Sequence, residues 1–176
     1  MFAFFILYID YFKEINDRLE HAEGDAVLVE FARKLREQFG EEHIVGRIGG
    51  DEFMAFMPVI NREMAEKQAS KLVEVLRRQV VTSVFKCDVT VSIGVALKWK
   101  TKTDFETLYR QADYALYQAK KRGRNQFVLK EKNDSQSVLY RIEDCIYTDD
   151  MFIDVSQRLN NLSYVKNILM KWGVML

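Results

Sequence analysis

Short apolar runs alternate with longer amphipathic stretches along most of the chain. The runs at 2–9, 44–48 and 53–57 have strand length, and the period of two across 87–99 predicts another strand. A last short strand is expected at 126–130. Helical spacing predicts three helices, whose apolar positions are Leu28, Phe31, Ala32, Leu35 and Phe39; Ala65, Ala69, Leu72, Leu76 and Val80; and Phe105, Leu108, Ala112, Ala115, Leu116 and Ala119.

Residues typical of helix ends stand at the borders of these stretches. Gly40 and Gly123 are expected to end the first and third helices. Asn61 is expected to cap the second helix, and TDFE at 103–106 is a capping-box pattern that opens the third. This order of elements predicts an α/β (α+β) sandwich in which helices flank a largely antiparallel sheet.

The composition changes near residue 131. A polar linker, KEKNDSQS, is followed by helical spacing from 138 to 172, which predicts one or two helices. We therefore expect a domain at 1–130 and a C-terminal linker with a helical tail at 131–176 that packs or self-associates. The chain starts directly in its first strand, so an upstream sensory domain is expected outside it.

The charge of the chain is balanced, with 26 basic and 26 acidic residues. A net charge of zero argues against electrostatic attraction of the whole chain to nucleic acid or to a membrane. The apolar start lacks a basic region and ends at Asp10, too early for a membrane segment. Cys87 and Cys145 show neither metal-ligand spacing nor a disulfide framework, so the reducing cytoplasm is the expected location.

Candidate chemistry begins with the stretch RIGGDEF at 47–53. Gly49 and Gly50 between two apolar strands predict a hairpin turn in which both glycines adopt positive φ. From this stretch alone, a plain hairpin is the simpler interpretation. The alternative is a turn that presents Asp51 and Glu52 to a divalent cation and lets a phosphate approach closely.

Four blocks occur in order along the chain: DYFKEINDRLEHAEGD at 10–25, RIGGDEF at 47–53, VSIGVA at 91–96 and RQADYALYQAKKRGRN at 110–125. Together they resemble the GGDEF family, the diguanylate cyclase domain of bacterial signalling, over residues 2 to about 130. The resemblance implies a palm-like, nucleotide-cyclase-like fold and a nucleotidyltransferase that condenses two GTP molecules into cyclic di-GMP. It also implies Mg²⁺ or Mn²⁺ as cofactor, and a homodimer in which each domain holds one GTP.

The resemblance assigns catalytic roles by position. Asp51 corresponds to a metal-ligating acid, and the backbone carbonyl of Ile9 to a further metal ligand. Glu52 corresponds to the acid near the attacking hydroxyl. Gly49 and Gly50 correspond to the turn that passes the α-phosphate.

A nucleotide site is implied in the same way. Asn16 and Asp25 correspond to the pair that reads guanine, although both residue types are also ordinary helix caps. The implied phosphate contacts are the backbone amides of Tyr11, Phe12 and Lys13 and the side chains of Lys120 and Arg124. Lys120 also suits a helix end electrostatically, without any ligand.

The sequence departs from the family at the metal position. Aligned on Phe12 and Lys13, Tyr8 stands where the family has its first metal-ligating Asp. A phenol whose usual pKa is about 10 is a poor Mg²⁺ ligand. Asp10 lies two residues further on the same strand face and is a candidate substitute.

A second departure concerns inhibition by product. Gly40 and His43 stand where many members carry the Arg and Asp that bind cyclic di-GMP. We therefore expect no inhibitory site here. Three functions stay open: a diguanylate cyclase with a weakened metal site, a degenerate domain that binds GTP or only a partner and acts by regulation, and a structural dimerisation module built on the tail.

Overall fold

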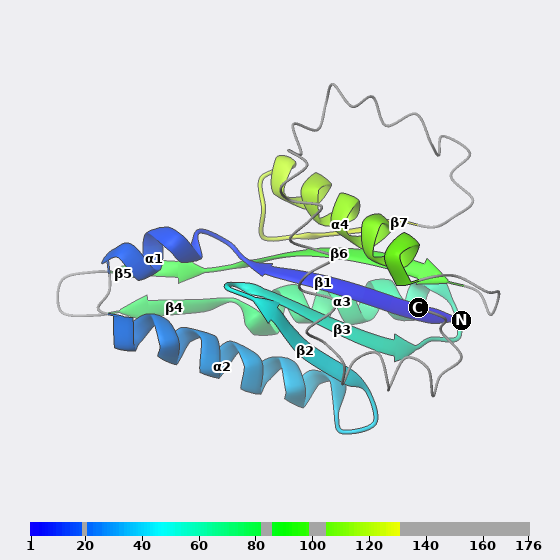
Figure 1. The fold of residues 1–176 in the computed structure, drawn as a ribbon, viewed down its shortest axis with the longest axis horizontal. Helices are drawn as coiled ribbons and strands as arrows, with labels where there is room; N and C mark the ends of the chain where they lie inside the picture. Colours follow the sequence, from blue (N-terminus) through cyan, green and yellow to red (C-terminus); the bar gives the residue numbers. More distant parts are fainter. Residues whose placement is uncertain (19–20, 82–85, 99–104, 131–176) are drawn as a thin grey trace.

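The computed structural model describes residues 1–18, 21–81, 86–98 and 105–130. Within these ranges the chain forms an α/β sandwich around a five-stranded sheet (Figure 1). The helical tail expected after residue 131 lies outside the described residues, as does Thr103 of the expected capping box.

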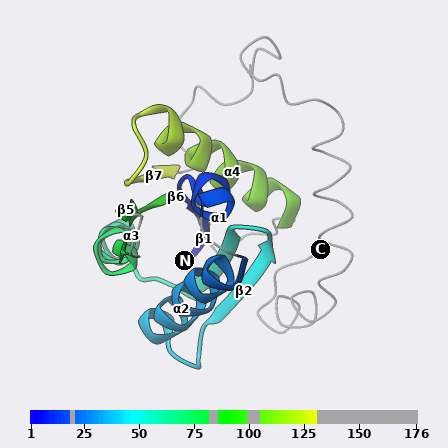
Figure 2. The ribbon, with the colours of Figure 1, turned by 90° about the vertical axis from the view of Figure 1, so that its left-hand side faces the viewer.

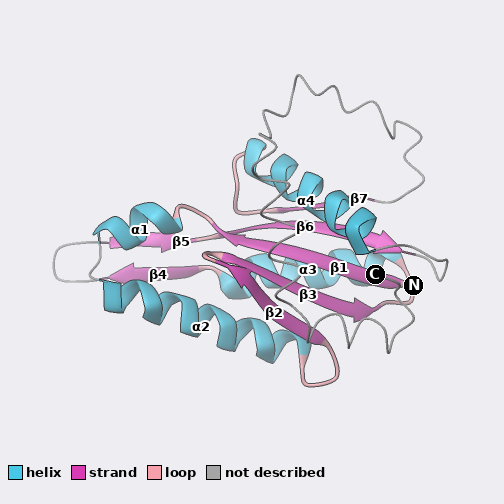
Figure 3. Ribbon diagram, viewed as in Figure 1, coloured by secondary structure: helices cyan, strands magenta, loops and turns pink. Residues whose placement is uncertain are grey.

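Figure 3 distinguishes the helices from the strands. The main sheet contains β1 (Phe2–Ile9), β2 (Ile44–Gly49), β3 (Glu52–Pro58), β6 (Val91–Lys98) and β7 (Phe127–Lys130). A separate two-stranded sheet is formed by β4 (Arg78–Val81) and β5 (Lys86–Val89). The helices are α1 (Phe12–Arg18), α2 (His21–Phe39), α3 (Arg62–Leu76) and α4 (Phe105–Lys121).

Strand β1 occupies the centre of the sheet, whose order is β2-β3-β1-β6-β7. It pairs antiparallel with both β3 and β6, and β2 pairs antiparallel with β3. Only β7, at one edge, runs parallel to its neighbour β6. The prediction of a largely antiparallel sheet flanked by helices is therefore confirmed.

Helices cover the sheet on both faces, with α4 on one side and α2 and α3 on the other (Figure 2). Alternate residues of β1 contribute to the two cores. Phe5 and Leu7 belong to the cluster under α2 and α3, while Phe4 and Ile6 belong to the cluster under α4. A strand covered on both faces needs apolar residues at nearly every position, which explains the continuous apolar run at the start of the chain.

Several predicted helix ends are confirmed. Helix α2 ends at Phe39, and Gly40 follows it with φ of 72°. The side chain of Asn61 accepts a hydrogen bond of 2.9 Å from the amide of Met64, so it caps α3. Gly123, with φ of 107°, follows α4.

Two predicted elements differ from those observed. Val80 was assigned to the apolar stripe of the second predicted helix, but α3 ends at Leu76 and Val80 lies in β4. Arg77 takes an extended conformation there, which redirects the chain into the small sheet. The single strand predicted at 87–99 is two strands, because β5 pairs with β4 whereas β6 pairs with β1 and β7.

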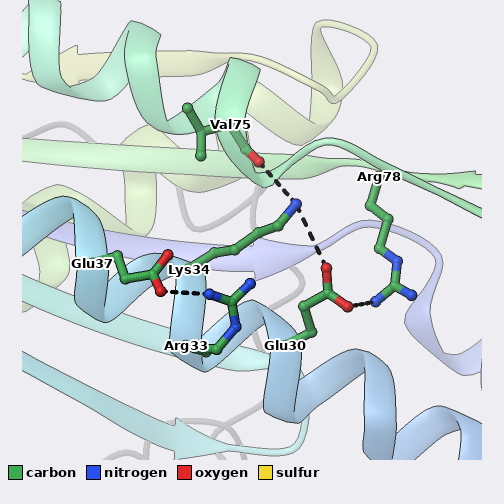
Figure 4. A network of polar contacts seen from close by, with 6 residues as sticks. All are labelled: Glu30, Arg33, Lys34, Glu37, Val75 and Arg78. Carbon is green, nitrogen blue, oxygen red and sulfur yellow. Dashed lines mark hydrogen bonds and ion pairs between the residues drawn. The ribbon is translucent and has the colours of Figure 1, made fainter.

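A polar network joins α2 to the end of α3 and the start of β4 (Figure 4). Glu30 forms ion pairs with Arg78 and, at 3.7 Å, with Lys34. The ammonium of Lys34 also donates a 3.4 Å hydrogen bond to the carbonyl oxygen of Val75. These contacts connect three elements on the face of the sheet opposite α4.

Candidate nucleotide and metal site

The β2–β3 hairpin turns one residue later than predicted. Gly49 is the last residue of β2 and pairs with Glu52, so the turn residues are Gly50 and Asp51. Only Gly50 has positive φ, at 50°, because a bulge before Gly49 shifts the register. The Nε of Arg47 donates a 2.8 Å hydrogen bond to the carbonyl of Gly50 and braces the turn.

The end of β1 lies directly beside this turn. Tyr8 is the register partner of Glu52, and the amide of Ile9 donates a 3.1 Å hydrogen bond to the carbonyl of Asp51. Ile6 and Tyr8 share the strand face that packs against α4. This pairing places the side chain at position 8 within reach of the acids of the hairpin.

Tyr8 contacts both an acid and a base. Its hydroxyl is hydrogen-bonded to Asp51, and the ammonium of Lys120 lies 3.1 Å from the centroid of its ring. Burial, followed by the charge and hydrogen bond of Asp51 and the charge of Glu52, raises the pKa of Tyr8 to about 12. The phenol is therefore neutral near pH 7 and donates its proton to the carboxylate of Asp51.

Lys120 lies in the last turn of α4 and is half-buried. Burial lowers the pKa of Lys120, while the charges of Glu52, Asp51 and Asp113 act in the opposite direction. A protein cation thus stands among the carboxylates of the candidate metal site. The ring of Tyr8 gives this cation an electron-rich face to rest on.

Asp10 is fully buried and accepts three hydrogen bonds. The donors are the hydroxyl of Ser92 at 2.7 Å, the hydroxyl of Thr90 at 2.8 Å and the amide of Asn125 at 3.1 Å. Both carboxylate oxygens take part, so Asp10 joins the end of β1 to the start of β6 and to the loop after α4. Sequence reasoning treated this residue only as a candidate metal ligand and did not find this tie.

Three residues near Asp10 have strained backbone conformations. Tyr11, Arg124 and Asn125, with φ of 58°, 63° and 48°, are the non-glycine residues with positive φ in the described ranges. The Arg124 guanidinium lies 4.7 Å from the Tyr11 ring centroid, and its Nη1 is 3.4 Å from the Tyr11 hydroxyl. Such conformations persist where the surroundings enforce them, often at ligand sites. Asp10 supplies one restraint by binding the amide of Asn125.

The proposed guanine-reading residues lie on neighbouring helices. Asn16 is half-buried on α1, and Asp25 is exposed on α2. A Cβ at Gly24 would lie 2.1 Å from Oδ1 of Asn16, so the absence of a side chain at Gly24 makes room for that amide. Gly24 was missed in the sequence, although a glycine inside a helical stretch is a recognised sign of close packing.

The remaining predicted positions lie at helix ends. Phe12 and Lys13 open α1, where the first backbone amides have no acceptor within the helix. At the end of α2, the amide of Gly40 donates to the carbonyl of Arg36 at 2.9 Å, and Nδ1 of His43 contacts the carbonyl of Phe39. Gly40 and His43 thus belong to the C-terminal end of that helix.

The side chains around Asp51 do not fit a Mg²⁺ ion as they stand. Magnesium requires oxygen ligands in near-octahedral geometry. Here Asp51 accepts the hydroxyl of Tyr8, Asp10 accepts three other donors, and Lys120 brings a positive charge. Within the described ranges, no group of three or more His, Cys, Asp and Glu side chains is arranged to hold a metal.

Comparison with known families matches residues 1–126 to the diguanylate cyclase GGDEF domain. The chain belongs to this family of signalling proteins, as the four sequence blocks predicted. It is 41% identical over 125 residues to the probable diguanylate cyclase DgcF of Escherichia coli K12, covering 68% of this chain and 40% of that protein. It is 36% identical over 133 residues to the diguanylate cyclase TpbB of Pseudomonas aeruginosa PAO1, covering 73% and 31% respectively.

Solved structures agree with this assignment. The GGDEF domain of PA1120 (YfiN or TpbB) from Pseudomonas aeruginosa matches with a TM-score of 0.67 and 35% identity, over 75% of this chain and 83% of that one. The GGDEF domain of DgcB from Caulobacter crescentus, solved in complex with c-di-GMP, matches with a TM-score of 0.65 and 28% identity, over 73% and 77%. The chain spans only 26% to 40% of the length of the first curated relatives. None of the helices in the described ranges has the length and hydropathy needed to cross a bilayer.

Proposed function

We propose that this chain is a GGDEF domain that binds GTP and, as it stands, makes little or no cyclic di-GMP. The observation that carries the proposal is the hydrogen bond from Tyr8 to Asp51, because the resemblance places the first metal-ligating Asp of the family at position 8. A neutral phenol replaces a carboxylate there, and it engages the remaining one. The site therefore loses the pair of acids that a divalent cation needs.

Retention of GTP binding is supported by the residues of the nucleotide site. Asn16 lies beside the turn of α2 that carries Asp25, and a carboxylate there could accept from the N1–H and N2–H₂ groups of guanine. Adenine lacks this donor edge, so we expect GTP to be preferred over ATP. Lys120 and Arg124 would supply positive charge for the phosphates.

Weak metal binding follows from the donor set. Asp51 and the carbonyl of Ile9 are the ligands we assign to any cation that does bind, with Glu52 near the attacking hydroxyl. Mn²⁺ is expected to support more product than Mg²⁺, because we take its geometric demands to be looser. Any catalysis would also require a homodimer, since each domain of the family holds one of the two GTP molecules.

A second candidate function is that of a catalytically inactive regulatory or dimerisation module. The same contacts favour it, because Tyr8 and Lys120 fill the surroundings of Asp51 with groups that bind one another. Measured GTP binding separates the two candidates. A module of this second kind would fold and associate without nucleotide.

The test uses the parent chain, Tyr8→Asp and Tyr8→Asp/Asp51→Ala. Each is incubated with GTP and either Mg²⁺ or Mn²⁺, the product is measured by chromatography, and binding of GTP and ATP is measured by calorimetry. We expect GTP binding by the parent with little product, and a rise in product for Tyr8→Asp that Asp51→Ala abolishes. Turnover by the parent at about 1 per second or faster would overturn the proposal, because that rate is ordinary for enzymes. A silent Tyr8→Asp that still binds GTP would place the defect elsewhere.

A further inference from the structure

We propose that this domain binds guanine nucleotide without a divalent cation, and that Lys120 supplies at Asp51 and Glu52 the positive charge that a metal would otherwise bring. The inference rests on the GTP binding proposed above. It concerns which group offsets the negative charge of Asp51 and Glu52 in the same site.

Lys120 reaches from α4 to the end of β1. Its side chain runs from the last turn of α4 toward β1, and its ammonium lies 3.1 Å from the ring centroid of Tyr8. The face of an aromatic ring attracts a cation, most strongly where water is partly excluded. An Asp at position 8 would offer no such face. Tyr in place of Asp at position 8 therefore removes a metal ligand and also provides an aromatic face for the ammonium of Lys120.

Negative charge at this site is partly offset by the protein itself. The ammonium of Lys120 lies against the ring of Tyr8, which is the register partner of Glu52, and the charges of Asp51 and Glu52 both act on it. Position 8 adds no negative charge, because its residue is a phenol rather than a carboxylate. A triphosphate entering this site thus meets one negative charge fewer than it would meet with Asp at position 8. The repulsion between the triphosphate and the acids of the site, which a metal ion would otherwise offset, is therefore smaller.

A second basic side chain, that of Arg124, lies just after α4. Arg124 follows α4 in a left-handed conformation, stacked on the ring of Tyr11. Asp10 holds the amide of the next residue, Asn125, and so restrains the backbone that carries Arg124. Two basic side chains, each resting on an aromatic ring of the β1–α1 segment, are therefore available to a polyphosphate without any metal.

The experiment measures binding of guanosine 5′-[α,β-methylene]triphosphate, which cannot be condensed. Calorimetric titrations are run in EDTA and in excess Mg²⁺ with the parent, Tyr8→Asp, Lys120→Met and the control Lys121→Met, which changes the exposed neighbouring lysine. We expect the affinity of the parent and of Lys121→Met to change by no more than about threefold between the two conditions. In EDTA, Tyr8→Asp and Lys120→Met should bind about tenfold more weakly or worse. Mg²⁺ should restore binding to Tyr8→Asp. Circular dichroism checks that each variant is folded.

The outcomes separate this inference from the proposed function. Binding by the parent in Mg²⁺ but not in EDTA would overturn the inference and leave GTP binding intact. Equal binding by Lys120→Met and the parent in EDTA would also overturn it, since another group would then supply the charge. Absence of binding by the parent in both conditions would overturn the proposed function and this inference with it.

Discussion

Removing the carboxylate of Asp10 should destabilise the domain more than any surface substitution. Asp10→Ala leaves three donors without their acceptor: the hydroxyls of Thr90 and Ser92 and the amide of Asn125. Ser92 is buried, Thr90 is half-buried and Asn125 is exposed, so water can satisfy part of what this variant loses. An unsatisfied buried donor costs about 1–3 kcal/mol, and the hydroxyl of Ser92 is such a donor, so we expect a loss of about 2 kcal/mol in the free energy of unfolding.

Asp10→Asn provides the matched control because it preserves the shape of the side chain. Its amide oxygen can accept from Thr90 and Asn125, and its NH₂ group can face the hydroxyl of Ser92, which rotates to accept. We expect a loss of only about 1 kcal/mol for this variant. Urea denaturation followed by circular dichroism gives both values, provided that the slope with denaturant concentration is unchanged.

The reasoning would be refuted if Asp10→Ala unfolded with a free energy within about 0.5 kcal/mol of the parent, the size of an ordinary surface effect. It would also be refuted if Asp10→Asn cost as much as Asp10→Ala. In that case the negative charge, rather than the three hydrogen bonds, would be what the fold requires. A weaker affinity for GTP in Asp10→Ala than in Asp10→Asn is a further expected result, because only the alanine variant loses the acceptor that restrains the backbone carrying Arg124.

Two further predictions concern α2. Gly24→Ala should weaken GTP binding about tenfold, because the new methyl group displaces the amide of Asn16. The free energy of unfolding should change by no more than about 1 kcal/mol, because alanine favours the helix. Unchanged affinity by calorimetry would contradict the role assigned to Asn16. Glu30→Gln should lower the free energy of unfolding by about 0.5–1 kcal/mol, because its pairs with Lys34 and Arg78 are partly exposed. Urea titrations at low and high salt should show this difference shrinking as salt screens the pairs, and a loss that salt does not reduce would contradict an ionic origin.

Much of the fold was predictable because its causes are local. The apolar run of β1 reports a strand buried on both faces, and Gly40 and Asn61 mark helix ends through conformations set by the residue itself or its near neighbours. Helical spacing likewise located α2, α3 and α4. The family could be predicted for a related reason, since its blocks combine residue types that the chemistry needs in a set order.

The parts that the sequence left undecided depend on partners far away in the chain. A period of two continues from β5 into β6, and only the pairing of β5 with β4 and of β6 with β1 separates them. The bulge before Gly49 moved the turn to Gly50 and Asp51, since register depends on the facing strand. The contact between Lys120 and the ring of Tyr8, and the hydrogen bond between Asp10 and Asn125, each join residues more than a hundred positions apart. The sequence alone determined that position 8 lacks a carboxylate; the folded chain decided which groups meet there, because side chains from separate elements contact one another only after the sheet and α4 pack together.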